Sequence, residues 1–160
     1  MTVAIIGGYS RSLLNFRWKL IESISASGYR VLGIAPEDDQ LVRRRFLESG
    51  NLYLNVPMER SGISLVGDVK YLWRVFKVLY DRTPEVVLCY TMKPVVYAGL
   101  AARIAGHSRV YVMITGLGYV FTGGSGLKKV LRFGVVQLLK MSLRGCSGVF
   151  FQNPDDEEEF

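Results

Sequence analysis

The chain alternates short apolar runs rich in β-branched residues with segments of helical periodicity, and this alternation constrains its fold more than any other feature. The apolar runs, predicted to be strands, are residues 2–8, 29–36, 51–57, 85–91, 109–115 and 147–153. Continuously apolar strands joined by helices indicate a parallel sheet covered on both faces. We therefore predict an α/β, doubly wound (Rossmann-like) sheet of about six strands. Its class and right-handed crossovers, rather than the periodicity, suggest the order 3-2-1-4-5-6.

The segments between the strands have the periodicity of helices. Helices are predicted over residues 10–28, 38–50, 65–82, 94–106 and 127–143. In the first of these, the apolar face is expected to comprise Leu13, Phe16, Leu20, Ile21 and Ile24. Leu72, Val75, Phe76 and Leu79 share one face of the helix at 65–82.

The length of 160 residues suits one domain. Its final residues read as the start of another element, with Asn153 as a helix N-cap, Pro154 at the first helical position and acidic residues after it. We expect a domain over residues 1–152 and, over 153–160, the beginning of a helix that leads to a missing C-terminal domain. A lone acidic tail is the alternative.

The charge is unevenly distributed. Five of the 14 acidic residues lie in the last six positions, so residues 1–154 carry 20 basic and nine acidic side chains. Such a surface favours anionic partners, among them nucleic acid, lipid headgroups and diphosphate substrates. Charge alone does not choose between them.

Several classes of site lack their usual residues. Cys89 and Cys146 have no CxxC spacing and are expected to be reduced, buried thiols of a cytosolic protein. The sole histidine, His107, lies between a helix and a strand, at the end of the sheet opposite the expected site. No Ser-His-Asp set and no Cys/His metal spacing is present, so we expect no metal. No signal peptide is visible, and the uncharged stretch 110–127 is too rich in glycine to span a membrane.

In open α/β sheets, ligands bind at the carboxyl ends of the strands where the winding direction reverses. The loop after the first strand begins with Gly7 and Gly8, which permit close backbone approach. The helix that follows is expected to offer free N–H groups to an anion. A plain tight turn is the alternative. Because GxGxxG is absent and Glu37 and Asp38 follow the second strand late, we do not expect an NAD-binding domain.

Two further loops are expected at the same edge. After the fourth strand, Lys93 precedes a helix that begins at Pro94, where a cation can face the crevice. A solvated surface lysine is the alternative. After the fifth strand, residues 114–126 combine glycines with Tyr119 and Phe121, which suits stacking on a ligand or covering it. A simple connection is again the alternative.

Four stretches of sequence carry a resemblance to a known family: "LLNFR", "TMKPVVYAGLAARIAG", "ITGLGYVFTG" and "VFFQNPDDEEEF". Together they resemble the N-terminal domain of family 4 glycosyltransferases, in particular those that act on polyprenyl-diphosphate-linked sugars in capsule, lipopolysaccharide or glycan assembly. The resemblance implies one lobe of a GT-B architecture. The N-terminal lobe would bind a lipid-linked saccharide acceptor, and the absent C-terminal lobe would bind most of a UDP- or other nucleotide-sugar donor. Transfer would retain the anomeric configuration, without a metal or other cofactor.

The same resemblance implies which residues line the crevice. These substrate- or phosphate-binding candidates are Gly7, Gly8, Asn15, Arg17, Lys93, Pro94, Thr115, Gly116, Leu117, Gly118 and Tyr119. Many members of the family carry a histidine after the fifth strand, where this chain has Thr115-Gly116, so no catalytic role is assigned to Thr115. The glutamate-bearing donor motif would lie in the second lobe. Catalytic residues therefore remain unassigned.

A lipid-linked acceptor implies contact with the inner face of the plasma membrane by a cytoplasmic, peripheral protein. One candidate helix carries Lys70, Arg74 and Lys77 beside Tyr71, Trp73 and Phe76, and the second is the long helix 127–143, with Lys128, Lys129, Arg132, Lys140 and Arg144. The alternative is that their apolar faces cover the sheet and their charges are merely solvated. A non-catalytic, membrane-associated subunit of a split glycosyltransferase is the second functional hypothesis. We do not expect a nucleic-acid binder, because aromatic residues do not interleave with the charges.

Overall fold

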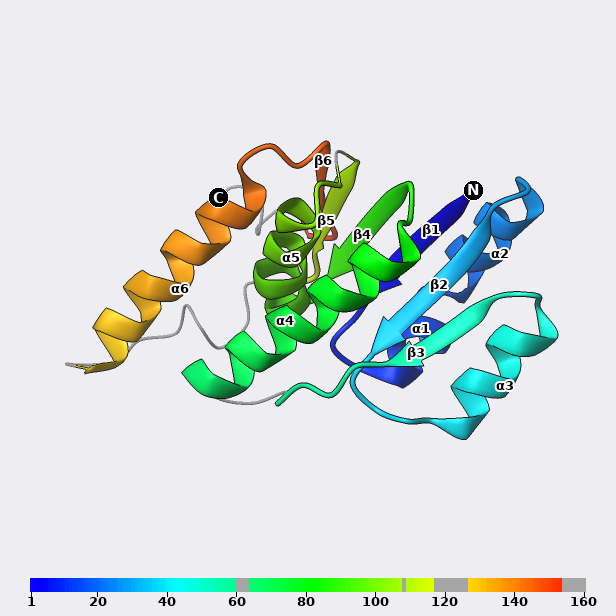
Figure 1. Ribbon diagram of the computed structural model, residues 1–160, viewed down its shortest axis with the longest axis horizontal. Helices are drawn as coiled ribbons and strands as arrows, with labels where there is room; N and C mark the ends of the chain where they lie inside the picture. Colours follow the sequence, from blue (N-terminus) through cyan, green and yellow to red (C-terminus); the bar gives the residue numbers. More distant parts are fainter. Residues whose placement is uncertain (60–63, 108, 117–126, 154–160) are drawn as a thin grey trace.

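The computed structural model describes residues 1–59, 64–107, 109–116 and 127–153. Its centre is a six-stranded parallel sheet in the order β3-β2-β1-β4-β5-β6 (Figure 1). The strands are β1 (Thr2–Ile6), β2 (Arg30–Ala35), β3 (Leu52–Asn55), β4 (Val86–Tyr90), β5 (Val110–Ile114) and β6 (Gly148–Phe151). The predicted fold class and strand order are confirmed.

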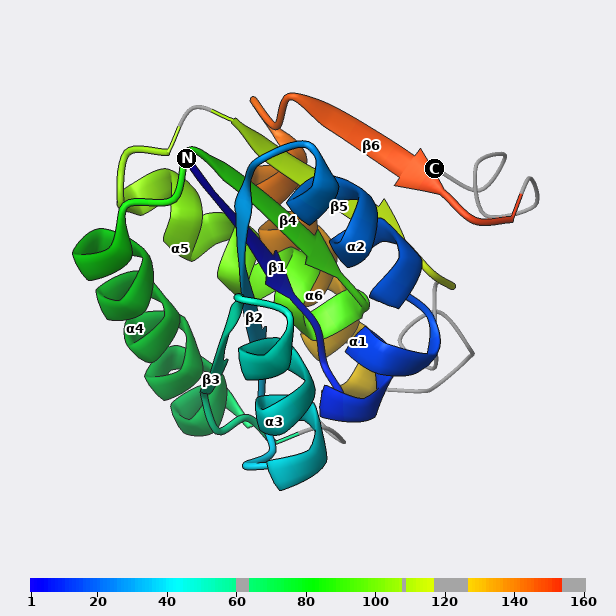
Figure 2. The same ribbon diagram turned by 90° about the vertical axis from the view of Figure 1, so that its right-hand side faces the viewer.

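Helices cover both faces of the sheet (Figure 2). On one face lie α1 (Ser10–Asn15), α2 (Trp18–Ala26) and α3 (Gln40–Glu48), and on the other lie α4 (Leu65–Arg82), the π-helix η1 (Pro94–Ala98), α5 (Gly99–Ile104) and α6 (Leu127–Leu143). Alternate residues of β1 serve the two cores: Val3 and Ile5 pack towards α1–α3, while Ala4 and Ile6 pack towards α4 and α5. Burial on both faces explains why the strands read as continuously apolar.

The helix predicted over residues 10–28 is two helices, which corrects the prediction. The chain leaves helical geometry at Phe16 and Arg17, where φ is −123° and −121°. Phe16 is consequently 73% exposed and Leu20 is 36% exposed, so neither belongs to the buried face that periodicity suggested. The break turns Arg17 inward, where its guanidinium lies over the ring of Tyr90.

The helix predicted over residues 94–106 also begins irregularly, as η1 followed by α5. The carbonyl of Val95 accepts a hydrogen bond of 2.5 Å from the Ser142 hydroxyl of α6. A Cβ added at Gly99 would lie 2.2 Å from that same hydroxyl, so glycine is required for this approach of α6. The bounds predicted for α4 and α6 are confirmed.

Candidate functional site

The carboxyl ends of β1 and β4 meet in close contact. Gly7 follows β1, and a Cβ placed there would lie 2.3 Å from the phenolic end of Tyr90, the last residue of β4. The next pair is equally close, because the Gly8 N–H donates to Thr91 Oγ1 at 3.0 Å. Thr91 adopts a left-handed φ of 66°, a conformation that costs a β-branched residue about 1–3 kcal/mol and is typical of functional sites. The glycine pair therefore joins two adjacent strand ends, as the doubly wound topology predicts.

The amino end of α1 was predicted to offer free N–H groups to an anion, but at least one of these groups already has a partner within the chain. Glu37, in the loop after β2, accepts the Ser10 N–H at 2.7 Å. Two residues further on, Asp39 pairs with Arg11 of α1. A carboxylate of the chain itself thus occupies at least one of the expected anion donors. The position of Glu37 could not be inferred from the sequence because it depends on packing of the β2 loop against α1.

Arg17 is a buried cation at this edge, with 8% of its surface exposed. Its guanidinium lies 4.9 Å from the centroid of the Tyr90 ring, and its Nη1 donates to the Phe16 carbonyl at 3.0 Å. The Gln152 amide, just after β6, lies 3.0 and 3.1 Å from the guanidinium when its oxygen faces it. Arg17 Nε is buried without a hydrogen-bond partner among the described residues. This burial lowers the pKa of Arg17, because the charged form loses hydration.

Tyr90 links Arg17 to α1. Its hydroxyl lies 2.7 Å from Ser12 Oγ, and burial raises the pKa of Tyr90 to about 12. The tyrosine is therefore a neutral platform, held by one hydrogen bond and stacked against one cation. Tyr90 and Ser12 were not among the predicted site residues. The sequence offers little indication of a functional role for them, since a tyrosine at the end of an apolar strand is equally typical of an ordinary core residue.

Lys93 lies on the α4 side of the same edge and is not the freely solvated lysine of the alternative interpretation. Its ammonium donates to Asp68 Oδ1 at 2.7 Å and to the Glu59 carbonyl at 2.7 Å. Asp68 lies in the first turn of α4, is 2% exposed, and also accepts from the Tyr97 hydroxyl at 3.0 Å. The ammonium is therefore held in one place. Asp68 was missed, because nothing in the local sequence separates it from an ordinary acidic residue at a helix start.

The other predicted residues are placed as follows. Pro94 is buried at the start of η1, Asn15 is exposed at the end of α1, and Thr115 and Gly116 directly follow β5. Leu117, Gly118, Tyr119 and Phe121 lie outside the described residues. The fold thus brings the glycine pair, Arg17, Lys93 and Thr115 to one edge of the sheet. Arg17 and Lys93 stand on opposite sides of it, one with α1 and α2 and one with α4. Because Asp68 and Glu37 share this edge, it is less positive than the sequence suggested.

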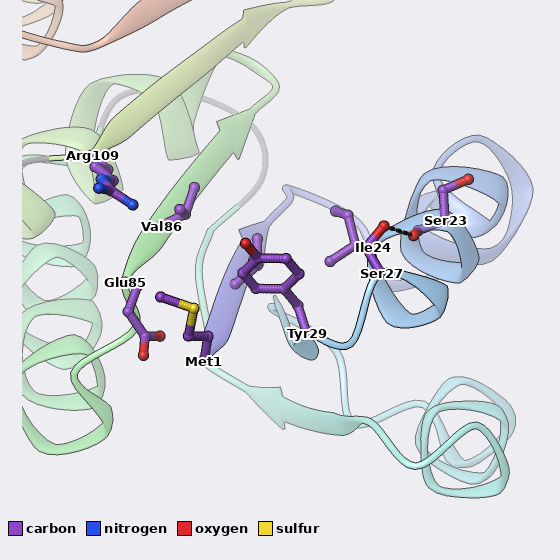
Figure 3. Close-up of a pocket in the computed structure, with 9 residues that line it drawn as sticks. Met1, Ser23, Ile24, Ser27, Tyr29, Glu85, Val86 and Arg109 are labelled. Carbon is purple, nitrogen blue, oxygen red and sulfur yellow. Dashed lines mark hydrogen bonds between the residues drawn. The ribbon is translucent and has the colours of Figure 1, made fainter.

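A depression of about 350 Å³ lies at the opposite, amino edge of the sheet (Figure 3). Its lining is mostly apolar and comes from the starts of β1 and β4 and the end of α2; it consists of Met1, Val3, Ser23, Ile24, Ser27, Tyr29, Glu85, Val86 and Arg109. His107 belongs to this half too, with Nε2 3.3 Å from the Leu79 carbonyl near the end of α4. Neither feature contacts the glycine pair or Lys93. Ligands of open α/β sheets bind at the carboxyl edge, so we place the candidate site there.

The remaining sequence expectations concern thiols, metals and membrane spans. Cys89 is buried and Cys146 is partly buried, and both are free. Burial raises the pKa of the Cys89 thiol well above its usual range, which makes it unreactive. Within the described ranges, no three His, Cys, Asp or Glu side chains gather in a way that could hold a metal ion. In the same ranges, no helix is long and apolar enough to cross a bilayer.

The chain resembles several solved structures at low identity. MurG from Acinetobacter baumannii aligns over 94% of this chain and 40% of its own, with 11% identity and a TM-score of 0.61. A UDP-N-acetylglucosamine 2-epimerase aligns over 99% and 43%, with 19% identity and a TM-score of 0.65. The lipopolysaccharide outer core galactosyltransferase WaaB aligns over 70% and 32%, with 16% identity and a TM-score of 0.51. These likenesses establish the fold, and the chain spans less than half the length of each structure.

Comparison of sequences distinguishes the families that share this fold. No curated protein sequence matches the chain. The family described as "Glycosyl transferase 4-like domain" matches residues 15–160, which include Arg17, Lys93 and the segment after β5. That match covers most of the chain. The chain therefore belongs to the glycosyl transferase 4-like domain family.

Proposed function

We propose that the chain is the acceptor-binding lobe of a retaining glycosyltransferase that moves a sugar from a nucleotide sugar to a lipid-linked saccharide. The observation that carries the proposal is the family match over residues 15–160. It is supported by the convergence of the glycine pair, Arg17 and Lys93 at the edge where ligands of such sheets bind. An acceptor carried on polyprenyl diphosphate is the substrate class we favour.

The chemistry of this edge suits a diphosphate-bearing acceptor. An ammonium has three N–H donors, and Asp68 and the Glu59 carbonyl take two of those of Lys93. The third is proposed to donate to a phosphate oxygen, in a direction fixed by the other two. Arg17 supplies a second cation, at a place where burial strengthens its interaction with an anion. Gly7 and Gly8 set the end of β1 against Tyr90 and Thr91 at the same edge.

The donor is proposed to bind mainly to a second lobe. The similar structures are more than twice as long as the region that aligns with this chain. In this arrangement the carboxyl edge of the sheet faces the second lobe, and the sugar passes between them with retention of configuration. Holding donor and acceptor together can contribute roughly 7–11 kcal/mol to lowering the barrier. Residues 1–160 alone should therefore show no detectable transfer.

The proposal places the protein on the cytoplasmic face of the membrane that carries the acceptor. The lipid tail would stay in the bilayer while the diphosphate and saccharide reach the carboxyl edge. Peripheral contact suffices for this arrangement, and it needs a surface that binds lipid headgroups.

Transfer from labelled nucleotide sugars tests the proposal. The full-length protein, incubated with membranes that contain endogenous polyprenyl-diphosphate saccharides, should label the lipid fraction. The label should be released by mild acid, which cleaves the glycosyl diphosphate. A set of nucleotide sugars that labels no lipid fraction would contradict the proposal.

Two other outcomes of this assay have distinct meanings. Conversion of the nucleotide sugar to its epimer without any acceptor would indicate an activity like that of the epimerases with the same fold. Labelling that appears only after a separate catalytic polypeptide is added would indicate the split glycosyltransferase.

A further inference from the structure

Helix α4 has two apolar faces: one is buried against the sheet, and the other is exposed apart from the partly buried Phe76. Tyr71, Val75 and Leu79 are buried in the core. A second row, which we call the α4 seam, recurs at spacings of three and four residues and consists of Val66, Val69, Trp73, Phe76 and Tyr80. That spacing places the five side chains along one line of the helix surface. The hydrophobic residues of α4 are thus more numerous than its packing requires.

The seam is open to solvent. Val66 is 68% exposed, Val69 63%, Trp73 58% and Tyr80 64%, while Phe76 is partly buried. The aromatic rings stack in sequence: Trp73 on Phe76 with centroids 5.1 Å apart, and Phe76 on Tyr80 at 5.8 Å. A contiguous apolar row on the surface of a soluble protein indicates an interaction site. The stacking holds the three rings in a fixed arrangement along the helix surface.

A strip of positive charge borders the seam. Lys70, Arg74 and Lys77 are exposed and follow one another at spacings of four and three residues. Arg74 also donates to the Pro57 carbonyl at 3.3 Å, which holds it along the helix. Of the two acidic residues of α4, Asp68 is buried against Lys93 and Asp81 is exposed near the end of the helix. The outer surface of α4 therefore combines tryptophan, tyrosine and aliphatic side chains with a net positive border.

We propose that the α4 seam is the surface by which the protein docks on an anionic lipid bilayer, with Trp73 and Tyr80 at the headgroup level. Aromatic and aliphatic side chains beside a basic strip match the interfacial zone, where the rings enter the headgroups and the cations meet anionic lipids. A second copy of the chain fits less well. Antiparallel twofold pairing of α4 would set the basic strip of one copy against that of the other.

The seam leads directly to the candidate site. It begins at Val66, two residues before Asp68, which holds the ammonium of Lys93. It then extends along α4 to Tyr80, about 21 Å at the helical rise per residue. The seam thus extends away from the carboxyl edge, which the proposed second lobe would face, towards the amino edge (Figure 1). A bilayer beneath α4 would bring the headgroups of its lipids next to Lys93.

Vesicle binding of the full-length protein tests the docking surface. The probes are phosphatidylcholine vesicles with and without phosphatidylglycerol, assayed by co-sedimentation. The wild type should bind the anionic vesicles, and W73E/Y80E should bind at least ten-fold more weakly, because it removes the two large exposed rings. K70Q/K77Q should lose about five-fold per charge at low salt and less at high salt.

The matched control is L41E/L47E. Leu41 and Leu47 are 53% and 71% exposed on α3, on the other face of the sheet, and the change in charge is the same. This control should bind like the wild type. Equal binding by W73E/Y80E and the wild type, or an equal loss in both double variants, would overturn the proposal. A loss of self-association in W73E/Y80E without any change in vesicle binding would assign the seam to a second copy instead.

Tryptophan fluorescence supplies an independent readout. The chain has two tryptophans, and Trp18 packs edge-on against Phe46 on the other face. In W18F, Trp73 is the sole tryptophan of these 160 residues, and its emission should shift to shorter wavelength on anionic vesicles. If the full-length protein contains further tryptophans, the emission of Trp73 is obtained by subtracting the spectrum of W18F/W73F from that of W18F. Transfer to a water-soluble acceptor should be unchanged in W73E/Y80E, which separates failure of docking from failure of the proposed activity. An unshifted emission upon vesicle binding would show that another surface docks.

Discussion

The ring of Tyr90 fills the space that any side chain at Gly7 would occupy. A Cβ at position 7 would lie 2.3 Å from both Cζ and Oη of Tyr90. The ring cannot easily yield, because Ser12 binds its hydroxyl on one side and Arg17 covers its face on the other. This contact joins the carboxyl ends of β1 and β4, the two strands between which the winding direction reverses. The candidate site is thus built on the close approach of the Gly7 backbone to the Tyr90 ring, with little room for substitution at position 7.

Gly7→Ala should therefore destabilise the protein. The added methyl group must displace a buried ring, which typically costs about 1–3 kcal/mol of unfolding free energy. Urea denaturation followed by circular dichroism measures the change. Gly134→Ala is the matched control, since Gly134 lies in α6 with nothing within 4 Å of its added Cβ, and it should gain about 0.5–1 kcal/mol from helix propensity. Equal stabilities of the two variants would contradict the packing described for Tyr90.

The ion pair between Lys93 and Asp68 should be asymmetric in its response to substitution. The Asp68 side chain is 2% exposed and that of Lys93 is 16% exposed, so only the lysine can turn towards water when its partner is lost. Lys93→Met should cost about 3–5 kcal/mol because it strands a buried carboxylate, and Asp68→Asn should cost less. The double variant should be more stable than the sum of the single losses predicts. Chemical denaturation of all three variants measures this coupling, and strictly additive losses would show that the pair contributes nothing.

The fold was predictable because its signals are local. The β-branched runs of the strands and the apolar spacing of α4 each lie within a short stretch of consecutive residues. They can therefore be recognised without knowledge of distant residues. The interruption after α1 was not predictable in this way, since Arg17 turns inward to meet Tyr90, which is 73 positions away. The periodicity of Leu13, Phe16 and Leu20 continues through the break and conceals it.

The candidate site was predictable in position but not in its electrostatics. The topology alone places Gly7, Gly8 and Lys93 at one edge. The carboxylates that share this edge come from elements whose packing the sequence does not specify: Glu37 caps the Ser10 N–H, and Asp68 pairs with Lys93. Counting charges along the chain could not reveal that they cancel locally.

The amino end of α3 supplies a dependence of stability on pH. Asp39 Oδ1 accepts the N–H groups of Leu41 and Val42 at 3.0 and 3.2 Å, and its other oxygen pairs with Arg11. Burial alone would raise the pKa of Asp39, but Arg11 and the two N–H groups hold it below its ordinary value. A depressed carboxyl pKa adds stability above the unfolded-state value, near pH 4, and this stability is lost as the pH falls through the folded-state pKa.

Asp39→Ala should accordingly cost about 1 kcal/mol at neutral pH, the usual value of an N-cap. The difference from the wild type should shrink as the pH falls below about 4. Asp39→Asn retains a cap acceptor and should cost less, without that titration. Thermal denaturation of the three proteins across this range measures the effect. A difference between Asp39→Ala and the wild type that is independent of pH would exclude a charged cap.

Arg17 should matter more for substrate binding than for folding. It is a buried cation with no carboxylate partner among the described residues, and the lowered pKa reflects its lost hydration. Replacing it by an apolar side chain of similar length removes the cost of burying a charge, which offsets the lost contacts. We therefore expect the free energy of unfolding of Arg17→Met to lie within about 1 kcal/mol of the wild-type value or above it. Urea denaturation measures this difference.

The acceptor dependence of the same variant should change strongly. If Arg17 binds the diphosphate of the acceptor, loss of a charge-assisted contact worth about 1.5–3 kcal/mol raises the acceptor KM of the full-length enzyme about ten-fold or more. The KM for the nucleotide sugar should stay unchanged. Arg17→Lys keeps the charge but loses the planar group that stacks on Tyr90, so its acceptor KM should be intermediate. An Arg17→Met enzyme that is destabilised by several kcal/mol yet binds acceptor normally would show that the guanidinium holds the turn between α1 and α2 and has no part in recognition.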